Sequence, residues 1–169
     1  MKWCALLAFF GFSTCAPAAE PLALGAPAPD VKALDATGTE VQLGNLYQKG
    51  WTLVYFYPKA DTPGCTAEAC GLRDAFAELT QKGIQVVGVS SDKVESQKKF
   101  ADKYHLPFTL LADTEHKVAD AFGVPHTLGF TSRQSFLIKG GKIVWRDLKA
   151  STKEQAADVL KAVGALGST

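Results

Sequence analysis

One stretch of the chain constrains its fold more than any other. Residues 51–57 form a near-continuous apolar run rich in β-prone side chains, residues 58–64 form a loop rich in Pro and Gly, and a helical pattern follows. A run of this kind is expected for a strand that is covered on both faces. A strand buried in this way needs helices on both sides of its sheet, so we expect an α/β fold built around residues 51–57.

The apolar pattern after the loop predicts one helix over residues 65–79. Its apolar side chains share one face and follow Cys65 at helical offsets; they are Ala69, Leu72, Phe76 and Leu79. We expect these further elements: an N-terminal β-hairpin of 31–34 and 40–43, a strand at 84–89, a helix at 94–104, a strand at 108–111, a helix at 116–122, a hairpin of 135–138 and 143–145, and a helix at 152–166. The last helix should bury Ala156, Val159, Leu160 and Val163. This order predicts a mixed central sheet with flanking helices.

Length and charge limit the classes of function. A chain of 169 residues suits one domain with a substantial core, and 47% hydrophobic with 21% charged residues is typical of globular proteins. Eighteen basic and seventeen acidic residues leave the chain nearly neutral, and no basic stripe suggests nucleic-acid binding. We therefore expect small molecules and other proteins as partners.

The first residues have the pattern of a secretory signal peptide. Lys2 supplies a positive charge, residues 3–12 an apolar core, and Ala16-Pro17-Ala18 a cleavage site of small residues. The apolar core is too short to span a bilayer, which takes about 20 residues. We therefore expect a periplasmic or secreted protein with no stable membrane association once the signal is removed.

Cleavage would divide the chain into a signal at 1–18 and a domain at 19–169. It would also leave Cys65 and Cys70 as the cysteines of the mature protein. The alternative is a lipoprotein signal with Cys15 as the lipidated residue, although the residues before Cys15 match that signal poorly.

Cys65 and Cys70 are placed for redox chemistry. Cys65 falls in the first turn of the predicted helix, where unpaired N–H groups and the helix dipole favour a thiolate. In a helix, five positions give a rise of about 7.5 Å and leave Cys70 about 140° around the axis. A disulfide needs Cα atoms within about 7 Å, so this pair could bond only if the helix start unwinds. A purely structural disulfide is the alternative in an oxidising compartment, but so short a closed loop stabilises little.

The residues around this pair resemble a known family. Pro58, Thr62 and Cys65 fit the Pro-x-x-x-Thr-x-x-Cys signature of the peroxiredoxins. The string at 62–70 resembles the bacterioferritin-comigratory-protein, or PrxQ, branch, which has a second cysteine at the position of Cys70. The resemblance continues through residues 89–92, 100–104, 106–113 and 133–136 and covers roughly residues 22–165.

The resemblance implies a thioredoxin-like fold and a thiol-dependent peroxidase without a cofactor. Cys65 would attack hydrogen peroxide or an organic hydroperoxide and become a sulfenic acid, which Cys70 would resolve as an intramolecular disulfide. A thioredoxin-like dithiol protein would then reduce that disulfide. The resemblance also implies that Thr62 hydrogen-bonds the thiolate or peroxide, that Arg133 lies beside the sulfur, and that Pro58 screens the pocket. The branch is often monomeric.

Each of these polar residues also has a simpler interpretation. Thr62 could cap the helix, and Arg133 could be a solvated surface charge. We interpret Glu68 as a favourable residue of the first helical turn and leave it outside the catalytic set. The histidines lack the spacing of metal ligands, so no metal site is expected; they are His105, His116 and His126.

Two other functions remain open from the sequence. A periplasmic thiol–disulfide oxidoreductase on the same fold usually has Cys-x-x-Cys, whereas this chain has Cys65-Thr66-Ala67-Glu68. A non-enzymatic binding protein gated by the disulfide would need neither Thr62 nor Arg133. The first rival predicts fast exchange with protein disulfides and slow reaction with peroxide, and the second predicts ordinary thiol reactivity.

Overall fold

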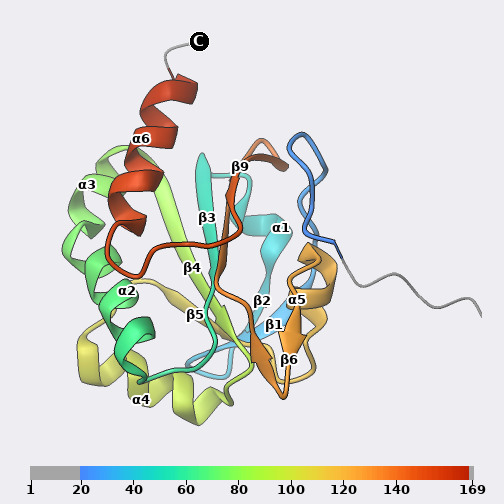
Figure 1. Cartoon of the computed structure of the whole chain (residues 1–169), viewed down its shortest axis with the longest axis vertical. Coiled ribbons are helices and arrows are strands. Elements are labelled where there is room, and N and C mark those ends of the chain that lie inside the picture. The colour runs from blue at the N-terminus through green and yellow to red at the C-terminus, as the bar shows by residue number, and fades with distance from the viewer. Residues whose placement is uncertain (1–19, 168–169) are drawn as a thin grey trace, which may run out of the picture.

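A computed structural model of the chain describes residues 20–167 (Figure 1). The signal peptide predicted at 1–18 lies outside the described residues. In chain order the elements are β1 (Lys32–Asp35), β2 (Glu40–Gln42), α1 (Leu43–Leu46), β3 (Trp51–Phe56), α2 (Pro63–Asp74), α3 (Phe76–Gln81), β4 (Ile84–Ser90), α4 (Val94–Tyr104), β5 (Thr109–Ala112), α5 (Lys117–Phe122), β6 (His126–Thr127), β7 (Phe130–Thr131), β8 (Gln134–Lys139), β9 (Lys142–Asp147) and α6 (Gln155–Gly167).

A mixed sheet of seven strands forms the centre of the molecule, in the order β2-β1-β5-β4-β3-β8-β9. β3 pairs parallel with β4 and antiparallel with β8, and all six of its residues are buried. β5 continues the parallel pairing on β4, and the hairpin of β1 and β2 closes that edge. The mixed sheet, the buried central strand and the N-terminal hairpin confirm the predicted fold class.

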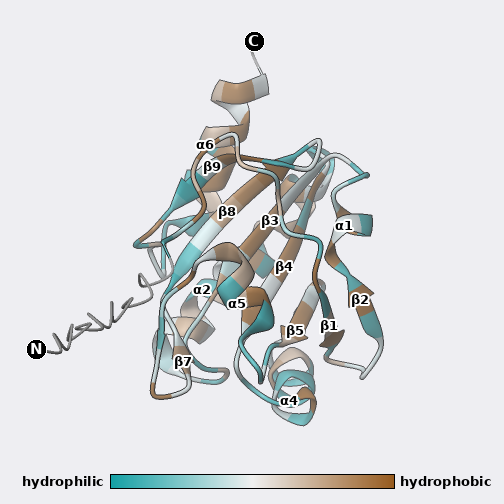
Figure 2. Ribbon diagram, turned by 90° about the vertical axis from the view of Figure 1, so that its right-hand side faces the viewer, coloured by the Kyte–Doolittle hydropathy of each residue, from teal (hydrophilic) through white to brown (hydrophobic). Residues whose placement is uncertain are grey.

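Helices cover both faces of this sheet. Four of them, α2, α3, α4 and α6, lie on one face, while α1 and α5 lie on the other (Figure 1). The hydrophobic residues concentrate along β3 and β4 between the two layers (Figure 2). Alternate residues of β3 enter separate apolar clusters: Leu53 and Tyr55 face α2 and α6, whereas Val54 and Phe56 face α5. The continuous apolar run of β3 follows from this burial on both faces.

The pairing register between β3 and β8 fixes where the later part of the chain meets the earlier part. Phe56, at the end of β3, pairs with Gln134, at the start of β8. Because the strands are antiparallel, the residue before Gln134 lies beside the loop that follows β3. Arg133 is that residue, so the sheet brings it next to the loop that leads to Cys65.

The prediction of a single helix over 65–79 was wrong. The structure has two helices, α2 and α3, separated at Ala75, whose φ of −88° and ψ of 1° interrupt the helical backbone. The apolar residues on the two sides of the interruption still face the sheet: Leu72 and Leu79 are buried, and Phe76 is half-buried. A hydrophobic period that continues across the break cannot reveal it.

Other boundaries also differ from the prediction. Leu43 begins helix α1 and does not extend the first hairpin, and the two-residue strands β6 and β7 were not predicted. The last helix begins at Gln155 and not at 152, because the Ser151 Oγ accepts hydrogen bonds from the next N–H groups in a turn before it. Its buried face contains Val159 and Val163 as predicted; the predicted Ala156 and Leu160 are half-buried, and Gln155 and Ala162 are also buried.

A bilayer-spanning helix is not found within residues 20–167, where every helix is too short or too polar for that role.

Candidate active site

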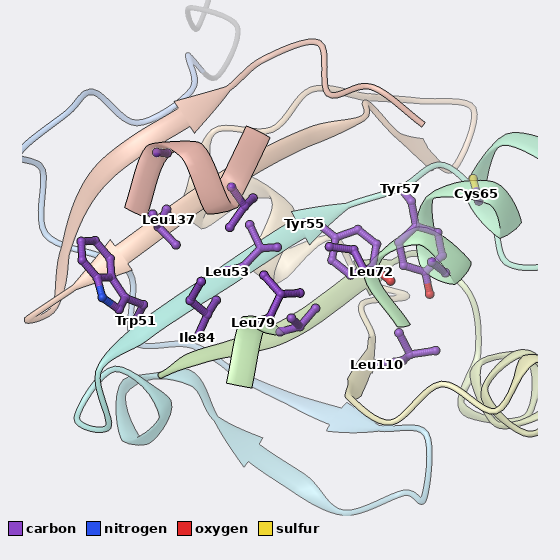
Figure 3. Close-up of a cluster of buried hydrophobic side chains, with 14 of the residues drawn as sticks. Trp51, Leu53, Tyr55, Tyr57, Cys65, Leu72, Leu79, Ile84, Leu110 and Leu137 are labelled. Atoms are coloured by element: carbon purple, nitrogen blue, oxygen red, sulfur yellow. The ribbon is translucent and has the colours of Figure 1, made fainter. Parts of the chain in front are cut away.

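The start of α2 presents Cys65 to the interior of the protein. Thr62 is the N-cap residue with extended φ and ψ, and Pro63 occupies the first turn, where its fixed φ suits a helix start. Cys65 therefore lies in the first turn, as predicted, and only 1% of its surface is exposed. Cys65 belongs to the same buried cluster as Ala69 and Leu72 of α2, and it lies near Tyr57 (Figure 3).

Arg133 supplies a positive charge directly to this sulfur. Its Nη2 lies 3.2 Å from the Sγ of Cys65, and the two residues are 68 positions apart in the chain. The guanidinium side chain is 18% exposed, so solvent screens it only partly. A cationic donor therefore lies within hydrogen-bonding distance of the Cys65 sulfur. The interpretation of Arg133 as a solvated surface charge is therefore wrong.

Glu68 was left out of the site by the sequence analysis, yet it is a central member. Its carboxylate Oε2 accepts a hydrogen bond from Nη1 of Arg133 in an ion pair, and its side chain is fully buried. The other oxygen, Oε1, has no hydrogen-bond partner within the described part of the chain. A signal for this burial existed: Glu68 follows Cys65 by three positions, on the face that also carries Ala69 and Leu72. A carboxylate on a buried stripe needs a partner.

The loop before α2 is fastened at several points. Thr131 Oγ1 donates to the carbonyl oxygen of Tyr57 at 2.8 Å, and the N–H of Ala60 donates to Asp92 Oδ2 at 2.7 Å. Pro58, between these two fastened residues, is half-buried. The structure thus places Pro58 at the entrance of a loop held by β7 on one side and by the segment after β4 on the other.

Thr62 does not cap the helix with its side chain. Its Oγ1 donates to the carbonyl oxygen of Lys59 at 3.0 Å, and it makes no side-chain hydrogen bond to the first turn of α2. The side chain is half-buried three residues before Cys65. Side-chain capping therefore does not explain Thr62, whose hydroxyl oxygen keeps both lone pairs for accepting hydrogen bonds.

Cys70 lies in a different environment of the same helix. Both cysteines are free thiols, and Cys70 is half-buried whereas Cys65 is buried. α2 is helical throughout 65–70, which keeps the two side chains apart as the spacing predicted. In the conformation described, a disulfide between them requires part of α2 to unwind.

Two buried tyrosines near Cys65 remain neutral. Burial is the main cause that raises the pKa of Tyr55 well above its ordinary value, and burial likewise raises the pKa of Tyr57. The Tyr57 hydroxyl donates to Gln97, whereas the Tyr55 hydroxyl has no partner among residues 20–167. Neither tyrosine therefore adds a charge to that of the Arg133–Glu68 ion pair.

The histidines lie away from this site. His116 and His126 stack face to face with ring centroids 3.9 Å apart, and His126 Nε2 contacts Asp120 Oδ1 at 3.0 Å. His105 lies elsewhere, as the C-cap of α4. Within residues 20–167, no three His, Cys, Asp or Glu side chains are grouped so that they could hold a metal ion.

Comparison with known proteins points to one family. The AhpC/TSA family matches residues 24–146. Peroxiredoxin Bcp of Escherichia coli K12 is 46% identical over 141 residues, which are 78% of this chain and 90% of that protein. Among solved structures, peroxidoxin BcpB from Mycobacterium tuberculosis has a TM-score of 0.80 at 34% identity and covers 85% of this chain and 97% of its own. Peroxiredoxin Q of Xanthomonas campestris has a TM-score of 0.77 at 30% identity, over 85% of this chain and 96% of its own.

Proposed function

Because the chain belongs to the AhpC/TSA family and resembles its Bcp/PrxQ peroxiredoxins over most of its length, we propose that Cys65 and Cys70 together carry out a two-cysteine peroxidase reaction. Family membership makes the chain a thiol-dependent peroxidase with a thioredoxin-like fold. The proposal adds which residues act, in which order, and what recycles them. The observation that carries it is the guanidinium of Arg133 at 3.2 Å from the buried Cys65 sulfur.

In the first step the Cys65 thiolate attacks one oxygen of the peroxide. A sulfur–oxygen bond forms as the O–O bond breaks, and the other oxygen leaves as water or an alcohol after taking up a proton. Arg133 stabilises the thiolate and the negative charge that moves onto the peroxide oxygens. Glu68 orients Arg133 by holding its Nη1, which leaves Nη2 directed at the sulfur.

Thr62 and Pro58 complete the proposed peroxide site. The Thr62 hydroxyl donates to the carbonyl oxygen of Lys59 and has lone pairs with which to accept a hydrogen bond from the O–H of the peroxide. Rotation of the same hydroxyl would instead let it donate to a peroxide oxygen. Pro58 shapes the entrance of the loop and restricts water beside the sulfur. Hydrogen peroxide and organic hydroperoxides are the proposed substrates.

In the second step Cys70 attacks the sulfenic acid on Cys65. The two sulfurs bond, the sulfenic oxygen leaves as water, and the pair becomes an intramolecular disulfide. Unwinding of the start of α2 must come first, because the helix keeps the cysteines apart. A thioredoxin-like dithiol protein then reduces the disulfide by thiol–disulfide exchange and returns both thiols.

Intact-mass measurement over time tests this sequence of steps. Reduced protein is mixed with one equivalent of hydrogen peroxide as wild type, Cys65→Ser and Cys70→Ser. We expect rapid loss of two hydrogen atoms in wild type, gain of one oxygen atom in Cys70→Ser, and no fast reaction in Cys65→Ser. Oxidation of wild type only at the rate of an ordinary thiol would contradict the peroxidase. Fast exchange with protein disulfides under the same conditions would then favour the oxidoreductase.

We also propose that residues 1–18 are a cleaved signal, that residues 19–169 form the mature domain, and that this domain acts as a monomer in the periplasm or outside the cell. The support is the sequence pattern of the N-terminus, which lies outside the described residues. Expression of the full chain in a bacterium, with intact mass measured on the exported fraction, tests it. We expect the mass of a chain that begins at Ala19. A lipid attached to Cys15 would contradict simple cleavage. Sedimentation velocity tests the monomer.

A further inference from the structure

The end of α4 contacts the loop that precedes the reactive helix. Lys103 Nζ lies 2.8 Å from both carboxylate oxygens of Asp61, and the Tyr104 hydroxyl donates to Asp61 Oδ1 at 2.6 Å. Asp61 has a φ of 58°, a left-handed conformation that Asp tolerates better than most residues. Three hydrogen bonds from two neighbouring residues therefore hold the chain immediately before the N-cap of α2.

The same turn of α4 also contacts the far end of α2. Arg73, in the last turn of α2, donates from Nη1 to the backbone carbonyl oxygen of Tyr104 at 2.9 Å. Its Nε and Nη2 donate to Asp74 Oδ1 at 2.9 and 2.7 Å, which fixes the guanidinium in this orientation. Tyr104 is thus shared: its side chain contacts the chain before α2, and its backbone contacts the last turn of α2.

We refer to these four residues, Asp61, Arg73, Lys103 and Tyr104, as the α4 brace. The segment between its two ends contains both cysteines and all of the helix that must unwind for them to bond. None of the four residues belongs to 65–70, so that segment can unwind with every contact of the brace intact. Arg73 follows Cys70 by three positions, which is one helical turn.

Asp61 and Lys103 of the brace are both charged around neutral pH. Hydrogen bonds from Lys103, and then from Tyr104, lower the pKa of Asp61, while the hydrogen bond to Asp61 is the first cause that raises the pKa of Lys103. A lowered carboxyl pKa means that the contact stabilises the fold above the ordinary pKa of Asp and is lost as pH falls through the lowered value. A raised amine pKa means that it is lost only at strongly alkaline pH.

We propose that the α4 brace positions both ends of the cysteine segment and confines the unwinding that accompanies disulfide formation to residues 62–72. This inference rests on the proposed two-cysteine reaction. Local opening in proteins proceeds in contiguous units whose limits are set by the contacts at their ends. Fixed ends also reduce the conformations open to the unwound segment, so Cys70 samples fewer positions away from Cys65.

Amide hydrogen exchange, followed residue by residue by NMR in the reduced and disulfide forms, tests the inference. Tyr104→Phe removes the hydroxyl on Asp61 and keeps the ring and the backbone carbonyl. Arg73→Met removes the donor to that carbonyl and keeps an unbranched side chain. Tyr47→Phe is the control for loss of a tyrosine hydroxyl, because the Tyr47 hydroxyl donates to the backbone carbonyl of Pro29 at 2.9 Å, on the other face of the sheet and outside the brace.

In wild type we expect oxidation to speed exchange only within residues 62–72. In Arg73→Met the oxidation-dependent increase should extend into α3, and in Tyr104→Phe into residues 57–61, by about fivefold or more, as for loss of one ordinary hydrogen bond. Tyr47→Phe should keep the wild-type limits.

If oxidation speeds amide exchange over the same residues in wild type and in both brace variants, the proposed role of the brace is wrong. The two-cysteine reaction would not be affected by that result. Faster exchange of equal size in the reduced and oxidised variants would also overturn it, because the contacts would then be merely structural. If oxidation of wild type gave a disulfide without faster exchange at 65–70, both the proposed unwinding and the proposed role of the brace would be wrong.

Discussion

Cys65 and Cys70 belong to one helix and differ in almost every property of their surroundings. Cys65 is buried beside a guanidinium that comes from 68 residues further along the chain, and Glu68 holds that guanidinium in place. Cys70 is half-buried, and Arg73, which follows it by one helical turn, contacts the end of α4. The two positions obtain their surroundings from different parts of the fold.

This difference teaches how one helix can carry two thiols with separate tasks. The reactivity of Cys65 depends on the register of β3 with β8, which places Arg133, and is therefore a property of the whole sheet. The mobility proposed for Cys70 depends on local contacts of α2 with its neighbouring helix. Substitutions at the residues that place Arg133 should change the rate of peroxide reduction. Substitutions at the contacts between α2 and α4 should change how far the helix opens.

Removal of the Arg133 charge should have the largest effect on the difference in reactivity between Cys65 and Cys70. Arg133→Met keeps an unbranched side chain but leaves Cys65 without the guanidinium that contacts its sulfur. We expect the rate of Cys65 oxidation by hydrogen peroxide to fall by about a hundredfold, the scale for loss of a donor that stabilises transition-state charge. Stopped-flow competition measures the rate. Arg146→Met is the control, because Arg146 donates to backbone carbonyls near Pro21 and not to the site; equal rates in the two variants would contradict the role of Arg133.

The orientation of Arg133 is the next point to test. Glu68→Gln removes the negative partner of a largely buried guanidinium, so we expect a loss of about 2 kcal/mol in the free energy of unfolding, below the range for fully buried pairs because Arg133 is partly exposed. Peroxide oxidation of Cys65 should slow by about tenfold as Arg133 moves. Urea unfolding and stopped-flow kinetics measure the two effects. Glu115→Gln, which breaks an exposed pair with Lys117, should change neither.

A substitution at the contact between β8 and α6 should lower the free energy of unfolding without changing the rate of Cys65 oxidation. The Ser135 hydroxyl accepts a hydrogen bond from Gln155 Nε2 in the buried contact between β8 and α6. Ser135→Ala leaves that amide unpaired, so unfolding should become easier by about 1 kcal/mol. The Cys65 oxidation rate should stay within about twofold of wild type if Arg133 keeps its place. A large loss of rate would show that Arg133 depends on the Ser135 contact.

The smallest expected effect concerns the loop before α2. Asp61→Asn keeps a residue that tolerates the left-handed backbone and removes the charge paired with Lys103. Because the pKa of Asp61 is lowered, the variant should be slightly less stable than wild type at neutral pH. The difference should begin to shrink below about pH 4, the ordinary value for Asp, and should vanish as the pH falls through the lowered value. Thermal unfolding of both proteins across this pH range measures it. A difference that persists in acid would mean that charge is not the cause.

Much of the fold follows from patterns that the sequence displays openly. The apolar run of β3, the polar helix α4 and the hairpin at Gly140 and Gly141 each have a local signal, and each was predicted close to its final limits. The break at Ala75 had none, because the apolar period continues through it. The strands β6 and β7 are two residues long, which is too short for any alternation to register.

The site divides in the same way. The place of Cys65 at a helix start could be predicted from the loop and the helical pattern around it. The burial of Glu68 could not be predicted with the same ease, since it depends on a partner 65 residues away that reaches it only after the sheet has formed. The position of Arg133 came from a family resemblance, and its physical cause, the register of β8 on β3, is visible only in the fold.

The ion pair of Glu68 with Arg133 has a consequence for the redox equilibrium of the cysteines. Glu68 belongs to the segment that must unwind, so a disulfide between Cys65 and Cys70 would draw it away from Arg133. Contacts made only in the dithiol form stabilise that form and raise the reduction potential of the pair, by about 30 mV for each 1.4 kcal/mol in a two-electron couple. An ion pair that assembles the peroxide site in the reduced protein would therefore also make the oxidised protein easier for a dithiol to reduce.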